Sequence, residues 1–452
     1  MTKLAELPIL ACSLDKWFCG GGIVRIRAGL TGLVALVLAT AVGCTSDGDG
    51  GDRPADAATA TTTAHHAATP PALDADATPR EVRARYEQLL GQHALLAVRL
   101  ARSEVAKDAE LQKVVQGSLA ANAGALQQLV GVSYDGAQAD EFKQLWQGYS
   151  DELAAYADAD AAGNGTGAQE ARAALLAHCD DWGAWLAEAS GGRVQAAQAT
   201  RSAQARVGRL MDQIDASAGH DYDQAYKLER QAYQQSYGAG TTLARAGLTA
   251  KEAADVATAP ENLRSAFAML LGEHMELIVD AQRATFAGSP EFEAAAAQVN
   301  ANTATLAGAL GGIVGPDKAK EFQTAWANHV EGLMAYTAAV AGKDEAAKAV
   351  AKENLDGFAE RLALYFSDVV RNVLATDPLT EAITAHDQHL IAQVDAYAAK
   401  DYAKAQQVQD EGYQQMVGVA NVLVDAIEKV MAQAMPAGGS KTGGGGTAHS
   451  HQ

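Results

Sequence analysis

The stretch LLGEHMELIVDAQ, residues 270–282, carries apolar side chains at intervals of three and four residues, with a histidine in the middle of the apolar face. That face comprises Leu270, Leu271, His274, Leu277, Ile278 and Ala281. A period near 3.6 residues is the signature of an α-helix. The same period continues through most of the chain, where proline is rare and the alternating pattern of β-strands is absent. The sequence therefore predicts an all-α fold.

A related stretch, LLGQHALLAVRLA, occupies residues 89–101. The likeness extends further along the chain, because Asn122 recurs as Asn302 and Trp146 as Trp326, both at an offset of 180 residues. A constant offset indicates a tandem duplication. The predicted organisation is unit 1 at 79–247, a linker at 248–261 and unit 2 at 262–435.

A shorter repeat lies within each unit. In unit 2, three histidines each stand fifteen residues before a residue suited to a helix N-cap, and these pairs are His274 with Ser289, His329 with Asp344, and His386 with Asp401. In unit 1 the same frame holds His93 with Asp108, Tyr149 with Asn164, and Arg206 with Asp221. Each segment reads as a helix, a tight turn and an antiparallel helix. We therefore expect two tandem helical bundles, each of three αα-hairpins, or about six helices.

The three histidines of unit 2 are the candidate site. If its hairpins pack around a common axis, His274, His329 and His386 face one another at the same height. Three imidazoles form a recognised site for copper or zinc, and haem is a less favoured ligand. Glu273 and Met416 are the candidate accessory residues. Unit 1 keeps only His93 of the set, so we expect it to be a structural partner.

Two other interpretations of these histidines remain open. Each can be an ordinary packed residue of the helical core, and an open solenoid would set the three in a row that never converges. An enzyme is not expected, because the chain has no nucleotide, zinc-protease or serine-hydrolase motif, and Glu273 or Glu276 would be its only evident base. An Asp-rich loop from Asp158 lacks the bidentate glutamate of a calcium site.

The N-terminal region predicts export. Arg25 and Arg27 precede an apolar run over 28–43, which ends in small residues before Cys44. The stretch TAVGC, residues 40–44, resembles a bacterial lipobox, although Ala41 stands where leucine is usual. The resemblance implies that Cys44 is lipidated and anchors the protein to the outer face of the cell membrane. Leader residues 1–23 precede the basic region, so we place the true start of residues 1–44 at Val24.

Composition defines the remaining segments. Residues 45–78 and 436–452 are rich in Gly, Ala, Thr and Asp, which predicts a disordered tether and a disordered tail. The mature part would keep one cysteine, Cys179, so no intramolecular disulfide is expected. A formal net charge of −20 argues against nucleic acid as a partner.

Further motifs carry a family resemblance. The pattern LLGEH, then AQVNANTATL, EFQTAWANHVEGLMAY and VDAYAAKDYAKA, resembles a family of uncharacterised exported bacterial helical-repeat lipoproteins, some loosely labelled copper amine oxidase. The label implies a tyrosine-derived cofactor in a β-rich enzyme, whose motif this sequence lacks. Where the family has His-Met in the last helix, Gln415 precedes Met416 here. We expect a non-enzymatic ligand-binding lipoprotein, or alternatively a structural protein that contacts an envelope partner.

Overall fold

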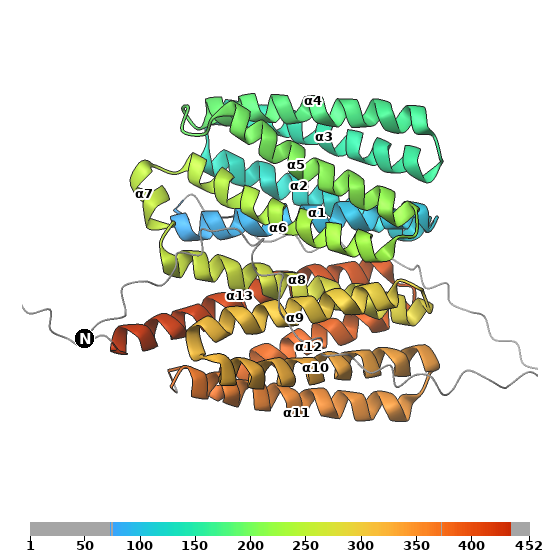
Figure 1. Ribbon diagram of the computed structural model, residues 1–452, viewed down its shortest axis with the longest axis vertical. Helices are drawn as coiled ribbons and strands as arrows, with labels where there is room; N and C mark the ends of the chain where they lie inside the picture. The colour runs from blue at the N-terminus through green and yellow to red at the C-terminus, as the bar shows by residue number, and fades with distance from the viewer. Residues whose placement is uncertain (1–72, 74–75, 372, 435–452) are drawn as a thin grey trace, which may run out of the picture. The chain divides into compact units, whose positions relative to one another are not determined.

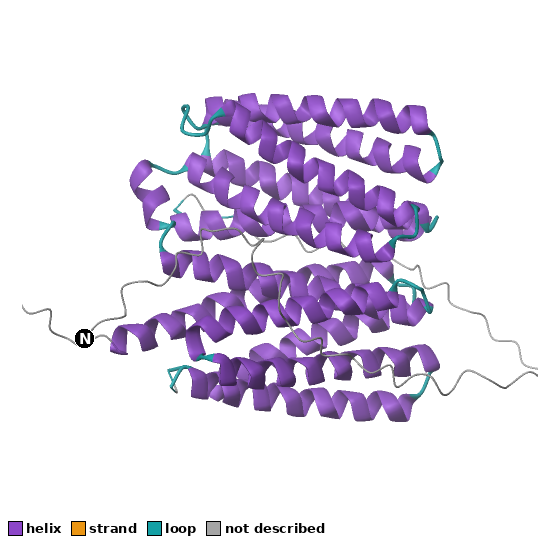
Figure 2. Ribbon diagram, in the orientation of Figure 1, coloured by secondary structure: helices purple, strands orange, loops and turns teal. Residues whose placement is uncertain are grey.

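The computed structural model describes residue 73, residues 76–371 and residues 373–434 (Figure 1). These residues form thirteen α-helices and no strand (Figure 2). The helices are α1 Pro79–Val105, α2 Ala109–Ser133, α3 Gly136–Ala161, α4 Gly165–Ala189, α5 Ala196–Ala218, α6 Tyr222–Gly247, α7 Ala250–Asp255, α8 Ala259–Ala287, α9 Phe292–Val314, α10 Pro316–Gly342, α11 Glu345–Val369, α12 Thr376–Ala398 and α13 Tyr402–Ala434. The leader at 1–44 with Cys44, all but the last residues of the tether, and the tail at 436–452 lie outside the described residues.

The all-α prediction is confirmed, but twelve helices in two bundles is an undercount. The additional helix, α7, lies inside the range predicted as a linker, and α8 also begins there, at Ala259. The physical reason is a capping box that the sequence reading overlooked. The Thr249 hydroxyl accepts a hydrogen bond from the Glu252 backbone, and the Glu252 carboxylate accepts one from the Thr249 backbone.

The turns within the hairpins follow the predicted caps with one exception. At five of the six turns, the predicted Asp or Asn side chain accepts a hydrogen bond from the third residue of the next helix; these residues are Asp108, Asn164, Asp221, Asp344 and Asp401. At the sixth turn, α9 begins at Phe292, after Glu291 rather than after Ser289. The Ser289 hydroxyl instead accepts from the Glu291 backbone at 3.2 Å, which caps the short turn around Pro290.

Matching hydrogen bonds recur in the two halves. The Asn122 side chain donates to the Leu89 carbonyl at 3.0 Å, and the Asn302 side chain donates to the Leu270 carbonyl at 3.0 Å. Further along, the Tyr156 hydroxyl donates to Asp215 and the Tyr336 hydroxyl donates to Asp395. The 180-residue offset therefore relates hydrogen bonds as well as residue types.

Helices α1, α6, α8 and α13 bring the two halves together, with α1 packed on α6 and α8 packed on α13. Two fully buried tyrosines occupy the region where these four helices meet. The hydroxyl oxygens of Tyr233 and Tyr413 are 3.3 Å apart. Tyr233 also bonds the Met269 carbonyl of α8, and Tyr413 bonds the Gln88 carbonyl of α1. Each tyrosine thus ties a helix of one half to a helix of the other.

Two glycines allow this close approach. A Cβ atom on Gly272 would lie 2.8 Å from the Tyr413 ring and 2.9 Å from the Tyr233 hydroxyl. A Cβ atom on Gly91 would lie 2.8 Å from the Tyr233 ring and 2.9 Å from the Tyr413 hydroxyl. The shared LLG at the start of both quoted stretches therefore has a steric role, because any larger side chain would force the tyrosines apart.

Buried ion pairs surround the tyrosines and also join the halves. Arg99 of α1 contacts Glu276 of α8 at 2.6 Å, and Arg230 of α6 contacts Glu273 of α8 at 2.8 Å. Charges buried this deeply are tolerated only when they are paired. The pairs therefore disfavour any relative shift of α1, α6 and α8, since a shift would leave charges without partners.

Asp410 of α13 lies in the same interface without an ion-pair partner in the described part of the chain. Its Oδ1 accepts hydrogen bonds from Gln92 and Gln406, both at 3.0 Å. Burial, and then the nearby charge of Glu276, raises the pKa of Asp410 to about 7. The Gln92–Asp410 bond stands where the other half has Glu273 and Arg230, so a neutral hydrogen bond replaces an ion pair.

The first prediction concerns the glycine at the tyrosine pair. Gly272→Ala should lower the free energy of unfolding by roughly 1–3 kcal/mol, because its methyl group overlaps two buried aromatic side chains. Gly238→Ala is the matched control, since a Cβ there meets nothing within 4 Å on an exposed face of α6. It should add about 0.5–1 kcal/mol through helix propensity. Equal effects of the two substitutions in urea unfolding would contradict the steric role.

The second prediction concerns pH. Because the pKa of Asp410 is about 7 in the folded protein and about 3.9 in an unfolded chain, the folded state retains a proton that the unfolded state has lost. Its contribution to stability therefore falls as pH rises from about 4 to about 7. Asp410→Asn should remove this loss and stabilise the protein at pH 8 by roughly 2–4 kcal/mol relative to pH 4. Urea unfolding of both proteins at the two pH values measures it, and a pH-independent difference would contradict it.

Candidate metal centre

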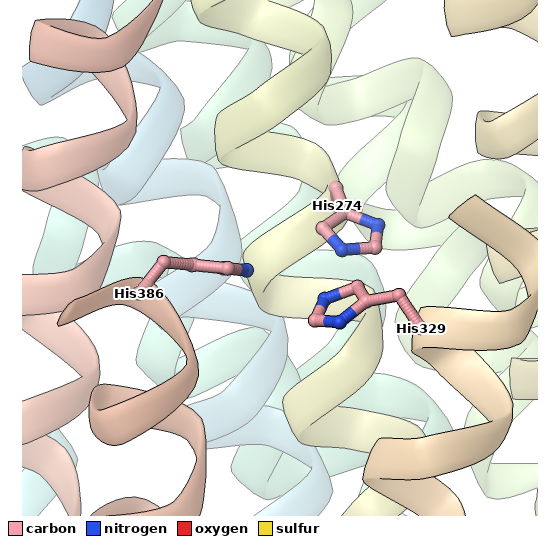
Figure 3. A group of neighbouring side chains, drawn as sticks. All are labelled: His274, His329 and His386. Carbon is pink, nitrogen blue, oxygen red and sulfur yellow. The ribbon is translucent and has the colours of Figure 1, made fainter. Parts of the chain in front are cut away.

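The three histidines of unit 2 lie on the first helix of successive hairpins, with His274 on α8, His329 on α10 and His386 on α12. Each occupies the apolar face of its helix, so folding carries all three into the interior. Their exposed fractions are 0%, 1% and 4%. Figure 3 shows the three rings pointing toward one another, each with a nitrogen directed at the space between them.

The rings are close enough to share a ligand. One nitrogen from each histidine lies within 4.8 Å of the other two, and the ring centroids are 5.9–6.0 Å apart. The structure therefore brings the histidines together rather than setting them in an open row. A point at the centre of such a triangle would be at most about 2.8 Å from each nitrogen. Because Zn–N bonds are about 2.0–2.1 Å, small side-chain rotations would complete a metal site.

Most of the ring nitrogens lack hydrogen bonds. Among the described residues, His274 Nε2, His329 Nδ1 and both nitrogens of His386 have no partner. The exception is His274 Nδ1, which accepts a hydrogen bond from the Trp326 indole at 3.3 Å. Buried polar atoms are nearly always paired in proteins, so this concentration of unpaired nitrogens marks the cluster as a candidate ligand site.

Burial keeps the imidazoles neutral. It lowers the pKa of His386 to about 3, with the neighbouring His389 adding to the effect. Burial also lowers the pKa of His274 and of His329 well below the usual value, and His386 adds to both shifts. A neutral imidazole has a free lone pair on one nitrogen, which is the form that binds metals.

Asp387 is the one carboxylate within ion-pair distance of the three histidines in the described chain. Its Oδ1 is 3.5 Å from His329 Nε2. The side chain is buried, and neither oxygen has a hydrogen-bond partner among the described residues. Burial raises the pKa of Asp387 well above its usual value, Asp356 raises it further, and Lys352 opposes the shift. A cation beside this group would favour its charged form.

A cavity of about 40 Å³ adjoins the cluster. Its lining is aliphatic and aromatic apart from His329, His386 and the thioether of Met416. The volume exceeds the roughly 30 Å³ share of one water molecule in the liquid but is far below the 300–1,000 Å³ of organic-ligand sites. A small ligand therefore fits beside the histidines, whereas haem does not.

The two accessory candidates have different surroundings. Met416 lies in the cavity lining with two of the histidines. Glu273, although adjacent to His274 in sequence, directs its carboxylate toward α6 and α9. Its Oε2 accepts from Arg230 and Asn302, both at 2.8 Å, and its Oε1 accepts from Gln234. Because both oxygens are engaged, we do not include Glu273 in the candidate site.

Sequence reasoning missed two neighbours of the cluster. Trp326 was interpreted only as a core anchor, although it stands one helical turn before His329 and so faces the same interior. Asp387 was not singled out. Its signal was available in the repeat, because Val207 stands 180 residues earlier and an aspartate replaces it on a buried face.

No protein-family model matches the chain, and no curated protein or solved structure does either. The resemblance to exported helical-repeat lipoproteins therefore stays a prediction. None of the helices within the described residues combines the length and apolar character needed to cross a bilayer.

Proposed function

We propose that this protein binds one transition-metal ion through His274, His329 and His386. The observation that carries the proposal is the convergence of three buried imidazoles whose nitrogens lie within 4.8 Å of one another and are mostly unpaired. Leaving a buried polar group unpaired costs about 1–3 kcal/mol. A bound ion would satisfy one nitrogen of each ring at once.

The surroundings favour copper(I), with zinc as the second candidate. A single carboxylate, Asp387, lies within ion-pair distance of the three histidines in the described chain. One negative charge balances a monovalent cation, whereas a divalent ion would leave a net charge in an apolar interior. The Met416 thioether beside the cavity points the same way, because soft sulfur ligands select copper(I).

Trp326 opposes metal binding at His274. An indole can only donate, so its hydrogen bond to His274 Nδ1 places the imidazole proton on Nε2. Coordination through Nε2 requires that proton to leave and the bond to Trp326 to break, at a cost of about 1–3 kcal/mol. Structural metal sites supply about 10–16 kcal/mol, which exceeds this cost.

The wider proposal is a non-enzymatic binding lipoprotein, exported and held at the outer face of the membrane by lipid on Cys44. A cavity of about 40 Å³ leaves no room for an organic substrate beside the ion, which supports a binding role over catalysis. The second candidate is a structural lipoprotein that contacts an envelope protein. The stacking of His329 on Phe358 at 4.4 Å favours it, since packed core histidines make such contacts.

The third prediction tests the metal site directly. In a full chain whose histidines outside the described residues (His65, His66, His449 and His451) are alanine, copper(I) or zinc should bind with one high-affinity equivalent. His386→Ala should weaken that equivalent by more than about 100-fold, since loss even of a residue that only orients a ligand costs 10–100-fold. Competition with a chromophoric chelator measures the affinity.

The matched control for His386→Ala is His93→Ala. His93 is equally buried at the corresponding position of unit 1, so its removal should destabilise the fold without changing metal affinity. Binding that survives His386→Ala would refute the metal site and support the structural alternative.

The fourth prediction uses the opposing hydrogen bond. Trp326→Phe removes the donor to His274 Nδ1 and should tighten metal binding about tenfold, the equivalent of about 1.4 kcal/mol. Trp146→Phe, the counterpart in unit 1, should leave the affinity unchanged. An unchanged affinity in Trp326→Phe would show that His274 is not a ligand.

A further inference from the structure

A second cluster occupies the corresponding place in unit 1. The rings of His93 and Trp146 have centroids 4.6 Å apart, and those of His93 and Tyr149 are 5.6 Å apart. The guanidinium carbon of Arg206 lies 5.9 Å from the centroid of the Tyr149 ring. His93, Tyr149 and Arg206 thus meet in unit 1 much as the three histidines meet in unit 2, with Trp146 in the place of Trp326.

Every member of this cluster has an unpaired polar atom. Within the described part of the chain, no hydrogen-bond partner exists for either nitrogen of His93, the Trp146 indole, the Tyr149 hydroxyl or Arg206 Nε. All four side chains are deeply buried, with exposed fractions of 4% for His93 and Trp146 and 6% for Tyr149 and Arg206. The indole, the hydroxyl and the guanidinium can all donate hydrogen bonds. The cluster is therefore rich in donors and poor in acceptors.

Arg206 is also a buried charge without a counter-charge. Among the described residues, no carboxylate lies within ion-pair distance of its guanidinium, unlike the buried Arg99 and Arg230. The neighbouring position is Val207, where unit 2 has Asp387. Buried charges are normally paired, because an isolated one costs several kcal/mol.

The titratable neighbours do not supply the missing negative charge. Burial raises the pKa of Tyr149 to about 12, against the opposing effect of Arg206. Burial likewise raises the pKa of the Cys179 thiol to about 11. Both groups are therefore neutral at physiological pH, and the positive charge of Arg206 remains uncompensated within the cluster.

We propose that unit 1 binds one small monovalent inorganic anion, of the class of chloride or nitrate, held by Arg206, the Tyr149 hydroxyl and the Trp146 indole. The anion supplies both the acceptor for these donors and the counter-charge for Arg206, through charge-assisted hydrogen bonds. Ring separations of 4.6–5.6 Å restrict the ligand to a small ion. A cation is disfavoured here, since Arg206 would repel it and His93 is the single imidazole.

The proposal is independent of the metal site in unit 2 and has its own test. Thermal unfolding of the full chain is compared in 0.5 M sodium chloride (roughly) and in sodium gluconate of equal ionic strength, because gluconate is too large for the cluster. A ligand that binds only the folded state raises the unfolding midpoint, here by roughly 2–5 °C. Arg206→Met should abolish the difference between the two salts, whereas His386→Ala should preserve it.

Because Arg206→Met can also disturb folding, a second measurement uses the parent protein. Crystals grown in sodium bromide should show one anomalous scattering peak beside Arg206 Nε and the Tyr149 hydroxyl. Absence of that peak, or unfolding midpoints that are equal in chloride and gluconate, would overturn the anion site. A salt effect that persists in Arg206→Met would do so as well, since it would come from elsewhere.

Discussion

The contact between Tyr233 and Tyr413 is the constraint on which the rest of this structure depends. Both rings lie against α1 and α8 at glycines, so the helices of the two halves approach more closely than a methyl group would allow. Successive residues of a helix are about 100° apart, so positions two apart face nearly opposite directions. With Gly272 turned to the tyrosines, His274 is turned to the interior of its own half. The stretch quoted at the outset is therefore buried on every side.

Much of the fold could be predicted because its signals are local. The helical period, the Asp and Asn caps and the 180-residue offset each reflect a few neighbouring residues, and the structure follows them closely. Whether the hairpins close around an axis or extend as a row is not a local property. It depends on the angle between packed helices, which the inter-half tyrosines and ion pairs restrict. The extra helix α7 was missed for the opposite reason, since its local capping box was present but overlooked.

The same distinction applies to the candidate site. The three histidines could be found because a repeat displays equivalent positions side by side. Glu273 was misjudged because adjacency in sequence rotates a helical side chain by about 100°, which here directs it to Arg230 instead of the histidines. Trp326 and Asp387 act across helices, and no helical period records such contacts. Comparison of the halves does record them, since Val207 has no charge where Asp387 has one.

Divergence between the two halves follows a rule of paired charges. Where one half has Arg230 with Glu273, the other has Asp410 with Gln92, and both contacts remain hydrogen-bonded. Changing one partner alone would leave a buried charge exposed to an apolar interior. The pairs Arg206–Val207 and His386–Asp387 break this rule within the chain itself, because each leaves one charged group without a partner of opposite sign. A unit with an unpaired cation and a unit with an unpaired carboxylate require counter-ions of opposite sign, so duplication of one scaffold supports two sites of opposite preference.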